Sequence, residues 1–428
     1  MATTPHRIVI VGGGFAGLWA TRALRNAPVS ILLIDRANHH LFQPLLYQVA
    51  TAGLSAPDIA APLRHILRRQ DNVEVRLAHV QHIEPEARRV VLDDGCDVAY
   101  DTLLLASGAT HAYFGHDDWA PFAPGLKTLE DALLLRRRLL LAFEHAEAQS
   151  DPAAQQAWLS FAIVGGGPTG VELAGTLAEI ARHTLKREFR NIDPATARVR
   201  LLEAGPRILS AFPESLSRKA HRQLERLGVE VVAGAPVEAI DAQGYRSNGT
   251  FVPARTVVWA AGVAASPLAR SLGVELDRAG RVRVAPDLSV PGHPDILVAG
   301  DLAAVTQADG KPVPGVAPAA KQMGTHVART IRDRLAGRAP PAFRYRDYGN
   351  LATIGRMAAV VDVHGFALSG LFAWWFWLTA HIFFLIGFRN RLAVLLNWAV
   401  AYWSYQRAAR IIFGRAPRAE ARGPSEAG

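Results

Sequence analysis

The apolar positions of the chain fall into short runs separated by helical stretches, a pattern typical of strands in a buried parallel sheet. Ile8–Val11 and Val29–Ile34 are two such runs, and Leu18–Leu24 between them reads as a helix. The second run ends on Asp35. This order of strand, helix and strand predicts a first Rossmann-like unit at the N-terminus.

The same order returns in the middle of the chain. Leu159–Val164 and Arg198–Leu202 read as strands, and Val171–Ala181 reads as the helix between them. The second strand runs into Glu203, and residues 182–197, rich in Arg, Lys and His, resemble an insertion. The pattern therefore predicts an α/β fold with two Rossmann-like dinucleotide-binding domains.

A glycine motif marks the first strand-to-helix turn. Gly12, Gly14 and Gly17 form G-x-G-x-x-G. The first glycine permits the tight turn, the second lets a pyrophosphate approach the backbone, and the third lets the helix pack on the strand. Asp35 is placed to accept hydrogen bonds from an adenosine ribose. This unit is expected to bind FAD.

A second motif occupies the matching turn of the second unit. Gly165, Gly167 and Gly170 repeat the glycine spacing, and Glu203 repeats the carboxylate at the end of the next strand. Two dinucleotide sites imply two cofactors, and a flavin with a nicotinamide donor fits them. The second unit is therefore expected to bind NADH.

Three further apolar strands end in small residues, where a large cofactor can lie close to the backbone. These ends are marked by Gly108, Gly262 and Gly300. Asp301, directly after the last of them, either caps a helix or hydrogen-bonds the ribityl chain and phosphate of a flavin.

Composition narrows the class of protein. The chain has 428 residues and a mean hydropathy of +0.10, high for a soluble enzyme. Its single cysteine, Cys96, excludes an internal disulfide and a C-x-x-C redox pair. No apolar segment precedes the first strand, so we expect no cleaved signal and a cytoplasmic location. We expect no metal site.

The C-terminal region combines apolar, aromatic and basic residues. Ser369–Phe388 contains no Lys, Arg, Asp or Glu and is long enough to span a bilayer, whereas the next apolar run, Leu392–Trp403, is too short. Tryptophans in both runs, with Tyr402 in the second and Tyr405 after it, favour a membrane interface. We favour two amphipathic helices in one leaflet over one spanning helix, with a homodimer interface as the alternative.

The net charge of +9 is concentrated at this end. The last 40 residues carry seven arginines and two glutamates. A basic stripe can indicate nucleic acid, but beside an apolar region it indicates anionic lipid headgroups, so no nucleic-acid partner is expected. We expect Arg389, Arg391, Arg407 and Arg410 to reach those headgroups. We also expect that the chain after about Gly365 can be removed without unfolding the rest.

The chain resembles the two-dinucleotide-domain flavoprotein reductases and, among them, the type II NADH dehydrogenases. The matching stretches include IVIVGGGFAGL, FQPLLYQVATAGLS, AIVGGGPTGVELAGTLAE, ILVAGD and APAAKQ. The resemblance implies a single-chain, non-pumping NADH:quinone oxidoreductase of a respiratory chain. It implies FAD and NADH as cofactors, a membrane quinone as acceptor, and a peripheral position on the cytoplasmic face of the membrane. The native quinone stays open.

The resemblance also implies residues for the reaction. Glu172 matches a glutamate near flavin and nicotinamide that serves proton delivery, although the helix dipole alone also favours a carboxylate there. Lys321 and Gln322 match the end of the quinone motif A-Q-x-A-x-Q, although both also suit a solvated helix face. Pro318 replaces the first glutamine of that motif and offers the quinone no side-chain hydrogen bond.

The predicted domains follow from these assignments. Residues 1–115 and 283–345 form a divided FAD-binding domain, residues 116–282 form the NADH-binding domain, and residues 346–428 form a membrane-anchoring region with a basic tail. Two alternative functions stay open at this stage. One is a soluble NAD(P)H-dependent reductase of a ferredoxin-like protein, and the other is a nucleotide-sensing interaction protein on the same fold.

Overall fold

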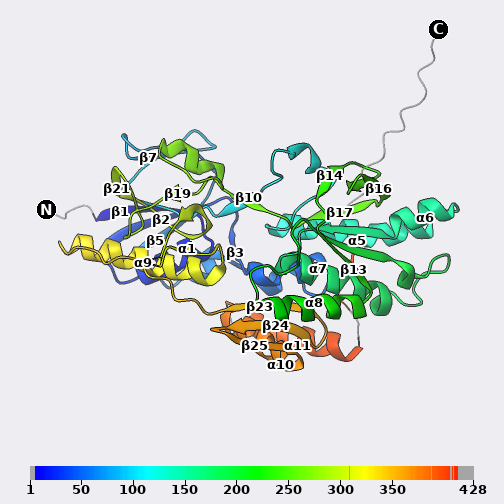
Figure 1. The fold of residues 1–428 in the computed structure, drawn as a ribbon. Helices are drawn as coiled ribbons and strands as arrows, with labels where there is room; N and C mark the ends of the chain where they lie inside the picture. The colour runs from blue at the N-terminus through cyan, green and yellow to red at the C-terminus, as the bar shows by residue number, and fades with distance from the viewer. Residues whose placement is uncertain (1–4, 308, 387, 405–406, 408, 413–428) are drawn as a thin grey trace, which may run out of the picture.

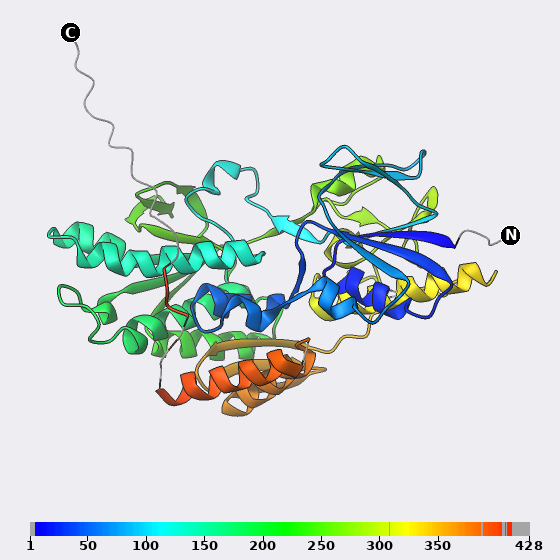
Figure 2. The ribbon, with the colours of Figure 1, turned by 180° about the vertical axis from the view of Figure 1, so that it is seen from behind.

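The computed structural model describes residues 5–307, 309–386, 388–404, 407 and 409–412. Two lobes lie side by side, and the C-terminal elements lie beneath the junction between them (Figure 1). The first lobe holds the N-terminal strands, the second holds the middle of the chain, and the reverse view shows the same arrangement (Figure 2).

The first lobe is built on a six-stranded sheet. Its order is β20 (Ser289–Val290), β21 (His293–Val298), β9 (Thr102–Leu105), β1 (His6–Val11), β2 (Val29–Asp35) and β5 (Val73–Leu77). All neighbours pair in parallel except β20 and β21. β1 is buried from Ile8 onward, as its unbroken apolar run predicts.

Two helices of this lobe pack against each other beside the sheet. Helix α1 (Phe15–Ala23) follows the first glycine motif, and α9 (Ala317–Leu335) comes from much later in the chain. They approach so closely that a Cβ on Gly324 would lie 2.1 Å from the carbonyl oxygen of Ala16. The crossing places the N-terminal halves of both helices at the same edge of the lobe.

The first lobe also holds a smaller sheet. β6 (Val80–Glu84), β7 (Arg89–Leu92) and β8 (Asp97–Ala99) form it, and its strands are antiparallel.

The second lobe repeats the plan with a four-stranded parallel sheet. Its order is β13 (Val229–Ala233), β12 (Arg198–Glu203), β11 (Ser160–Val164) and β17 (Thr256–Trp259). Its helices are α5 (Leu129–Glu147), α6 (Pro152–Trp158), α7 (Pro168–Glu179) and α8 (Glu214–Arg226). An antiparallel sheet of β14 (Val237–Ile240), β15 (Gly244–Ser247) and β16 (Thr250–Pro253) completes the lobe.

An antiparallel ribbon connects the lobes, formed by β10 (Ala109–His111) and β18 (Val263–Ala265). The chain returns to the first lobe earlier than expected. Leu268, Leu272 and Val282 lie in the core of the first lobe, so the return falls near residue 266 rather than at 283. β19 (Val282–Arg283) pairs with β22 (Ala303–Ala304) within that lobe.

The C-terminal region is a small layered unit rather than a pair of helices alone. β23 (Asn350–Gly355), β24 (Ala358–Val363) and β25 (Phe366–Gly370) form an antiparallel sheet, and α10 (Leu371–Phe384) and α11 (Phe388–Ser404) follow. β23 packs on α7 and α10 packs on β24. Trp374, Trp377 and Trp398 belong to the same core as α5 and α7.

This packing corrects the expectation that the chain after Gly365 is removable. A cut there would delete β25 and both helices, and it would strip buried tryptophans from the core of the second lobe. The two predicted helices do form, but the helix expected from Ser369 begins at Leu371 and ends at Phe384. In the described part of the chain, no helix combines the length and apolarity needed to cross a membrane.

The segment from Phe42 to Ala50 also belongs to the core. Phe42, Leu45, Leu46 and Tyr47 are at most 3% exposed and pack with α5, α7 and α10. η1 (Gln43–Leu45) and α2 (Leu46–Ala50) carry them. Core packing is therefore the role that the geometry gives these side chains.

Candidate functional site

The first glycine motif has the geometry of a phosphate cradle. Gly12 has φ +107°, and a Cβ there would lie 2.3 Å from the Ala106 carbonyl oxygen. A Cβ on Gly17 would collide with the Gly12 carbonyl, so the third glycine sets the helix against the strand. A Cβ on Gly14 would meet no atom within 4 Å, so open space lies in front of its backbone. α1 begins at the next residue and directs its free N–H groups and positive dipole end there.

Asp35 is oriented by the same turn. Its Oδ2 accepts a hydrogen bond from the Gly13 N–H at 2.5 Å, and its Oδ1 accepts one from the Ala37 N–H at 2.7 Å. Burial raises the pKa of Asp35, and both backbone N–H groups oppose that rise. Each carboxylate oxygen has a further lone pair, so the group can also accept from ribose hydroxyls.

The second motif reproduces these relations. Gly165 has φ +111°, a Cβ on Gly170 would collide with the Gly165 carbonyl, and a Cβ on Gly167 would meet no atom within 4 Å. Glu203 accepts hydrogen bonds from the N–H groups of Gly166 and Gly205, both at 2.7 Å. Both cradles therefore present an open glycine, a helix N-terminus and a carboxylate fixed by backbone donors. These residues fit two dinucleotides.

Asp301 faces a partner that the sequence did not reveal. The Nζ of Lys127 lies 3.1 Å from Asp301 Oδ2, and both side chains are about one-fifth exposed. Asp301 lies inside the short helix η6 (Gly300–Leu302), whose N-cap is Ala299, so Asp301 does not occupy a capping position. Of the two roles left open for Asp301, capping is therefore wrong. The ion pair joins the start of the second lobe to the first.

The remaining glycines differ in their surroundings. A Cβ on Gly108 would meet no atom within 4 Å, and one on Gly300 would make ordinary contacts with Ala16 and Ala320. A Cβ on Gly262 would lie 2.4 Å from the ring of Phe114, so this glycine makes room for an aromatic side chain. Only the first two therefore leave space beside the backbone for a cofactor.

Glu172 is deeply buried on α7. It lies in the second turn of that helix, because α7 begins at Pro168. Its Oε1 is 3.4 Å from the Thr353 N–H of β23, the single hydrogen-bond donor found for it in the described structure. Burial raises the pKa of Glu172 well above its usual value. A helix-dipole role explains this position less well than it would explain the first turn.

Gln322 and Lys321 point in different directions from α9. The amide of Gln322 donates to the Arg346 carbonyl and accepts from the Arg346 N–H, both at 2.9 Å, so it fastens the segment before β23 to α9. The ammonium of Lys321 lies 4.8 Å from the ring centre of Trp19 and 5.3 Å from that of Phe384. Pro318 lies in the first turn of α9, where proline is well tolerated.

Two buried polar contacts were not predicted from the sequence. His40 Nδ1 lies 3.0 Å from the Gly13 carbonyl oxygen, and burial lowers the pKa of His40 to about 4, so the ring is neutral. Gln48 accepts from the indole N–H of Trp398 at 2.7 Å and thereby ties α2 to α11. His40 stands in no motif, Gln48 lies within the FQPLLYQVATAGLS stretch, and the partners of both residues lie far away in sequence.

The basic residues expected to reach lipid are engaged within the protein. Arg391 donates to the carbonyls of Leu385 and Phe383 at the end of α10. Arg407 donates to the Thr51 carbonyl and lies 3.5 Å from the buried Glu179. Arg410 pairs with Glu188 at 2.5 Å, and the side chain of Arg389 lies outside the described residues. Arg391, Arg407 and Arg410 therefore hold parts of the protein in this structure, and the lipid contact expected for them stays a prediction.

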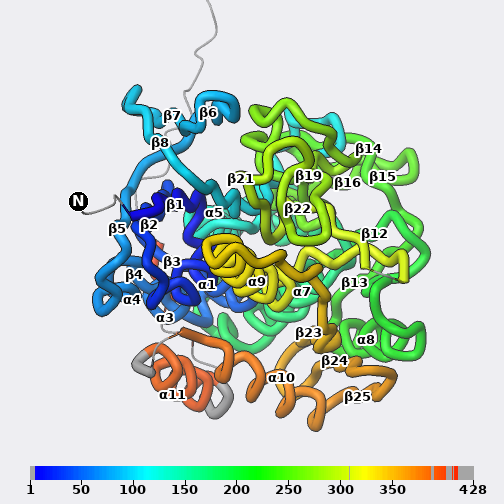
Figure 3. Tube along the Cα trace, turned by 90° about the vertical axis from the view of Figure 1, so that its left-hand side faces the viewer, coloured from blue at the N-terminus to red at the C-terminus, as the bar shows by residue number. Residues whose placement is uncertain are grey.

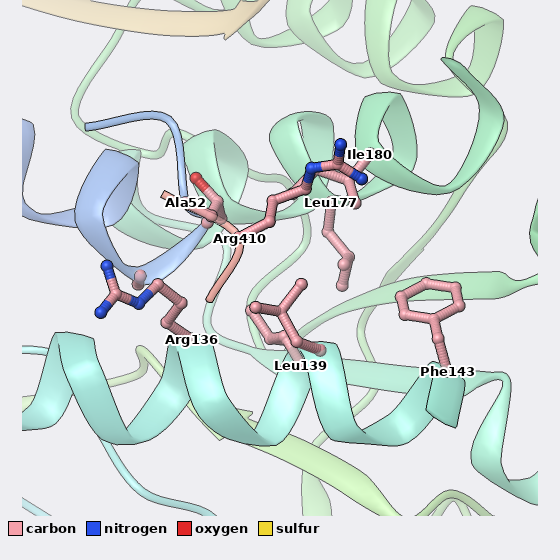
Figure 4. Close-up of a pocket in the computed structure, with 10 residues that line it drawn as sticks. Ala52, Arg136, Leu139, Phe143, Leu177, Ile180 and Arg410 are labelled. Atoms are coloured by element: carbon pink, nitrogen blue, oxygen red, sulfur yellow. The ribbon is translucent and has the colours of Figure 1, made fainter. Parts of the chain in front are cut away.

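Arg410 also closes a small apolar pocket between α5 and α7. Figure 4 shows its side chain crossing above Leu139 and beside Leu177, with Arg136 on the other side of the opening. None of the residues that line this pocket belongs to either glycine motif. It is separate from both cradles and is covered by the C-terminal segment.

The C-terminal helices present a broad apolar face to solvent. Phe372 is 78% exposed, Phe383 68%, and Val400 60%. We define the aromatic face as the exposed apolar residues of α10 and α11: Leu371, Phe372, Trp375, Phe376, Phe383, Phe384, Leu392, Leu395, Leu396 and Val400. A monomeric soluble protein rarely leaves such a patch uncovered, so the face marks an interaction surface.

Comparison with known proteins agrees with this geometry. A profile for the pyridine nucleotide-disulphide oxidoreductase family matches residues 6–324, and one for the NDH2 C-terminal domain matches residues 348–404. The chain is 48% identical over 417 residues to the type II NADH:quinone oxidoreductase Ndh of Mycobacterium tuberculosis. That match covers 94% of this chain and 89% of the relative.

Two further comparisons extend this likeness. The chain is 30% identical over 412 residues to demethylphylloquinone reductase NdbB of Synechocystis, covering 93% of this chain and 96% of that protein. Its fold is similar to the structure of NDH2 from Plasmodium falciparum in complex with NADH, with a TM-score of 0.86 at 19% identity. The structural match covers 96% of this chain and 100% of the other.

Proposed function

The chain belongs to the type II NADH:quinone oxidoreductases, within the pyridine nucleotide-disulphide oxidoreductase family, and from this premise we propose which residues carry its reaction. It is a membrane-associated flavoenzyme that uses FAD and NADH and reduces a quinone. When bound, FAD would supply the acceptor for the hydride of NADH and the donor of two electrons to the quinone. The work of the protein is to hold both nucleotides, orient them and exclude water.

FAD is held at the first cradle. The backbone at Gly12, Gly14 and Gly17 receives the pyrophosphate at the N-terminus of α1, and Asp35 accepts the ribose hydroxyls. Gly108 and Gly300 leave room for the rest of the cofactor. Asp301, held by Lys127, faces its ribityl chain and phosphate.

NADH is held at the second cradle. Gly165, Gly167 and Gly170 receive its pyrophosphate, and Glu203 accepts the 2′-OH of its ribose and repels the 2′-phosphate of NADPH. Gly262 contributes indirectly, because its missing side chain admits Phe114 beside the ribbon between the lobes. The observation that carries this part of the proposal is the repeated geometry of the two cradles.

Glu172 holds a proton near the point where the nucleotides and quinone meet. Its buried carboxyl is protonated at pH values at which an exposed glutamate is ionised, because burial raises its pKa. It lies two residues after Gly170, the last glycine of the second cradle, and contacts β23 of the C-terminal unit. This position suits proton delivery during quinone reduction.

The quinone end is built where α9 meets the C-terminal unit. Gln322 is a positioning residue, because both ends of its amide hold the Arg346 backbone. Lys321 lies toward α10, on the side from which a membrane quinone arrives. Because Pro318 brings no donor, the quinone contacts differ from those of the A-Q-x-A-x-Q pattern.

The aromatic face rests on the membrane, and the protein is peripheral and lies on the cytoplasmic side. Aromatic side chains and exposed aliphatic residues on one face of α10 and α11 suit the interfacial layer of a bilayer. Anionic lipid completes this contact. Pairing of two chains through the same face is the competing arrangement, and sedimentation in detergent separates them, since a dimer would persist there.

Separating the two half-reactions by stopped flow tests the proposed sites. NADH should bleach the flavin absorbance, and a short-chain quinone should restore it. Gln322→Leu should slow the second step and leave the first intact, because it frees the segment at Arg346 without touching either cradle. An equal loss in both steps would mean damaged FAD binding. A protein that binds both nucleotides but fails to reduce any quinone would be a nucleotide sensor instead.

A further inference from the structure

Two cations flank one tryptophan where the first lobe meets α10. Lys321 Nζ lies 4.8 Å from the ring centre of Trp19, and the guanidinium carbon of Arg22 lies 5.9 Å from it. Phe384, the last residue of α10, covers the other side of the ammonium at 5.3 Å. We call Trp19, Arg22, Lys321 and Phe384 the cationic notch.

The notch carries positive charge that no carboxylate neutralises in the described structure. Neither Arg22 nor Lys321 takes part in an ion pair with a described residue, although Figure 3 shows that several elements surround α1 and α9. Burial lowers the pKa of Lys321, and the charge of Arg22 lowers it further. The two like charges around this one ring repel each other, and a bound anion would reduce that repulsion.

The position of the notch indicates which anion is available. Phe384 belongs both to the notch and to the aromatic face, so the two surfaces are continuous. Figure 3 shows α1 and α9 side by side above α10 and α11. If the aromatic face enters the headgroup layer, the notch lies at the level of the lipid phosphates.

The described C-terminal arginines have other partners than a lipid phosphate. Arg391, Arg407 and Arg410 already bind carbonyls and carboxylates of the protein. Arg407 and Arg410 have carboxylate partners and Arg391 is held by backbone carbonyls, whereas no described carboxylate or carbonyl holds the side chain of Arg22 or Lys321, the notch cations of α1 and α9.

We propose that the cationic notch binds the phosphate of an anionic phospholipid headgroup, an inference that rests on the membrane association proposed above. The guanidinium of Arg22 offers paired donors to two phosphate oxygens, and Lys321 adds a compact charge. The indole of Trp19 suits the membrane interface. The lipid would then fix the first lobe, and not only the C-terminal unit, against the bilayer.

Vesicle binding of the full-length, FAD-loaded protein tests this site. The variants are Arg22→Gln, Arg22→Gln/Lys321→Gln and the control Arg25→Gln, which removes a charge just after the end of the same helix. Arg25 donates to the Arg69 carbonyl and does not belong to the notch. Co-sedimentation uses phosphatidylcholine vesicles and vesicles of phosphatidylcholine mixed with phosphatidylglycerol. Native mass spectrometry then counts the phosphatidylglycerol retained by each variant.

Arg22→Gln should weaken binding to the mixed vesicles about fivefold relative to the control, and the double variant should weaken it further. Binding to phosphatidylcholine alone should not change, and the double variant should lose one retained phosphatidylglycerol. Equal losses for Arg22→Gln and Arg25→Gln would overturn the site and indicate general surface charge. Competition by inorganic phosphate as strong as that by phosphatidylglycerol would overturn the choice of lipid. If the native chain bound no vesicle at all, the proposed membrane association would fall as well.

Discussion

Three carboxyl groups in this structure differ in burial and hydrogen bonding, and they therefore suit different chemical roles. Asp35 and Glu203 each stand at the end of a strand and accept two backbone N–H groups, which keeps them oriented toward an open cradle. Glu172 is buried with one long hydrogen bond and favours its protonated form. The first two therefore suit ribose recognition, and the third suits proton transfer.

Replacing Glu203 with alanine should reduce the preference for NADH over NADPH. The variant loses the acceptor for the ribose 2′-OH and the negative charge that repels a 2′-phosphate. A charge-assisted hydrogen bond of about 1.5–3 kcal/mol corresponds to a fall in kcat/KM for NADH of roughly tenfold to a hundredfold. Steady-state kinetics with both nucleotides measure this. Equal efficiency with NADH and NADPH in the native enzyme would refute the role of Glu203.

Replacing Glu172 with glutamine should stabilise the protein increasingly as the pH rises. The folded-state pKa is raised above 4.5, so the unfolded chain ionises first and the native protein loses stability from about pH 4.5 up to the folded pKa. Within that pH window, the unfolding free energy of the native protein falls by about 1.4 kcal/mol for each pH unit. The glutamine variant does not show this fall, because glutamine resembles the protonated acid and does not ionise. Urea unfolding at a series of pH values measures the difference between the two proteins.

Glu179 is also buried but is present in both proteins, so its titration cancels in that comparison. A stability difference that stays constant with pH would show that Glu172 is ionised in the folded chain. The pH profile of quinone reduction tests its function separately. If that profile and the rate are unchanged in Glu172→Gln, the carboxyl delivers no proton.

At the scale of elements, α7 serves two parts of the molecule. Its N-terminus forms the second cradle, and its middle supports β23 so closely that a Cβ on Gly175 would lie 1.7 Å from the Ile354 carbonyl oxygen. Its last residue, Glu179, accepts the Arg356 N–H and pairs with Arg407. The helix therefore joins the nucleotide site, the C-terminal sheet and the segment after α11.

Replacing Arg407 with alanine should release the segment after α11 and destabilise the fold. Glu179 and Arg407 are both less than 15% exposed, and removal of the cation leaves a buried carboxylate unpaired. We expect a loss of about 3 kcal/mol in urea unfolding and faster proteolysis after α11. Arg410→Ala is the control, because its partner Glu188 is 40% exposed and the expected loss is below about 1 kcal/mol. If the double variant Arg407→Ala/Glu179→Gln regains stability relative to Arg407→Ala, the loss comes from the carboxylate left without its cation. If the double variant regains no stability, this explanation is wrong.

Local sequence patterns predicted the helices and strands better than they predicted which side chains contact one another across the fold. The strands of both lobes were evident because a buried parallel strand needs an unbroken apolar run, as in Ile8–Val11. Both helices begin earlier than periodicity alone indicates, because Gly14 serves as N-cap of the first and Pro168 suits the first turn of the second. The pairs Lys127–Asp301 and Gln322–Arg346 leave no local signal, since only the fold brings their residues together.

At the scale of the whole molecule, the C-terminal unit has an inner and an outer side. The inner side belongs to the core that α5 and α7 share, through Trp374, Trp377 and Trp398. The outer side is the aromatic face. One sequence region thus combines structural tryptophans with surface aromatics, and composition alone did not separate the two sets. Substitutions on the face, rather than truncation, are therefore the sound test of membrane contact.

The triple variant Phe372→Ser/Trp375→Ser/Phe383→Ser should separate membrane contact from catalysis. All three side chains are more than half exposed, so their loss leaves the core intact. Each aromatic side chain withdrawn from the interface should weaken vesicle binding about tenfold, given roughly 1.5–3 kcal/mol for full burial of a large apolar side chain. NADH oxidation with a water-soluble acceptor should persist, whereas reduction of a long-chain quinone in vesicles should fall with the bound fraction. Trp374→Phe, a conservative change on the inner side, is the control and should leave vesicle binding unchanged. Unaltered vesicle binding by the triple variant, together with conversion of a dimer to a monomer, would assign the face to a second copy of the chain.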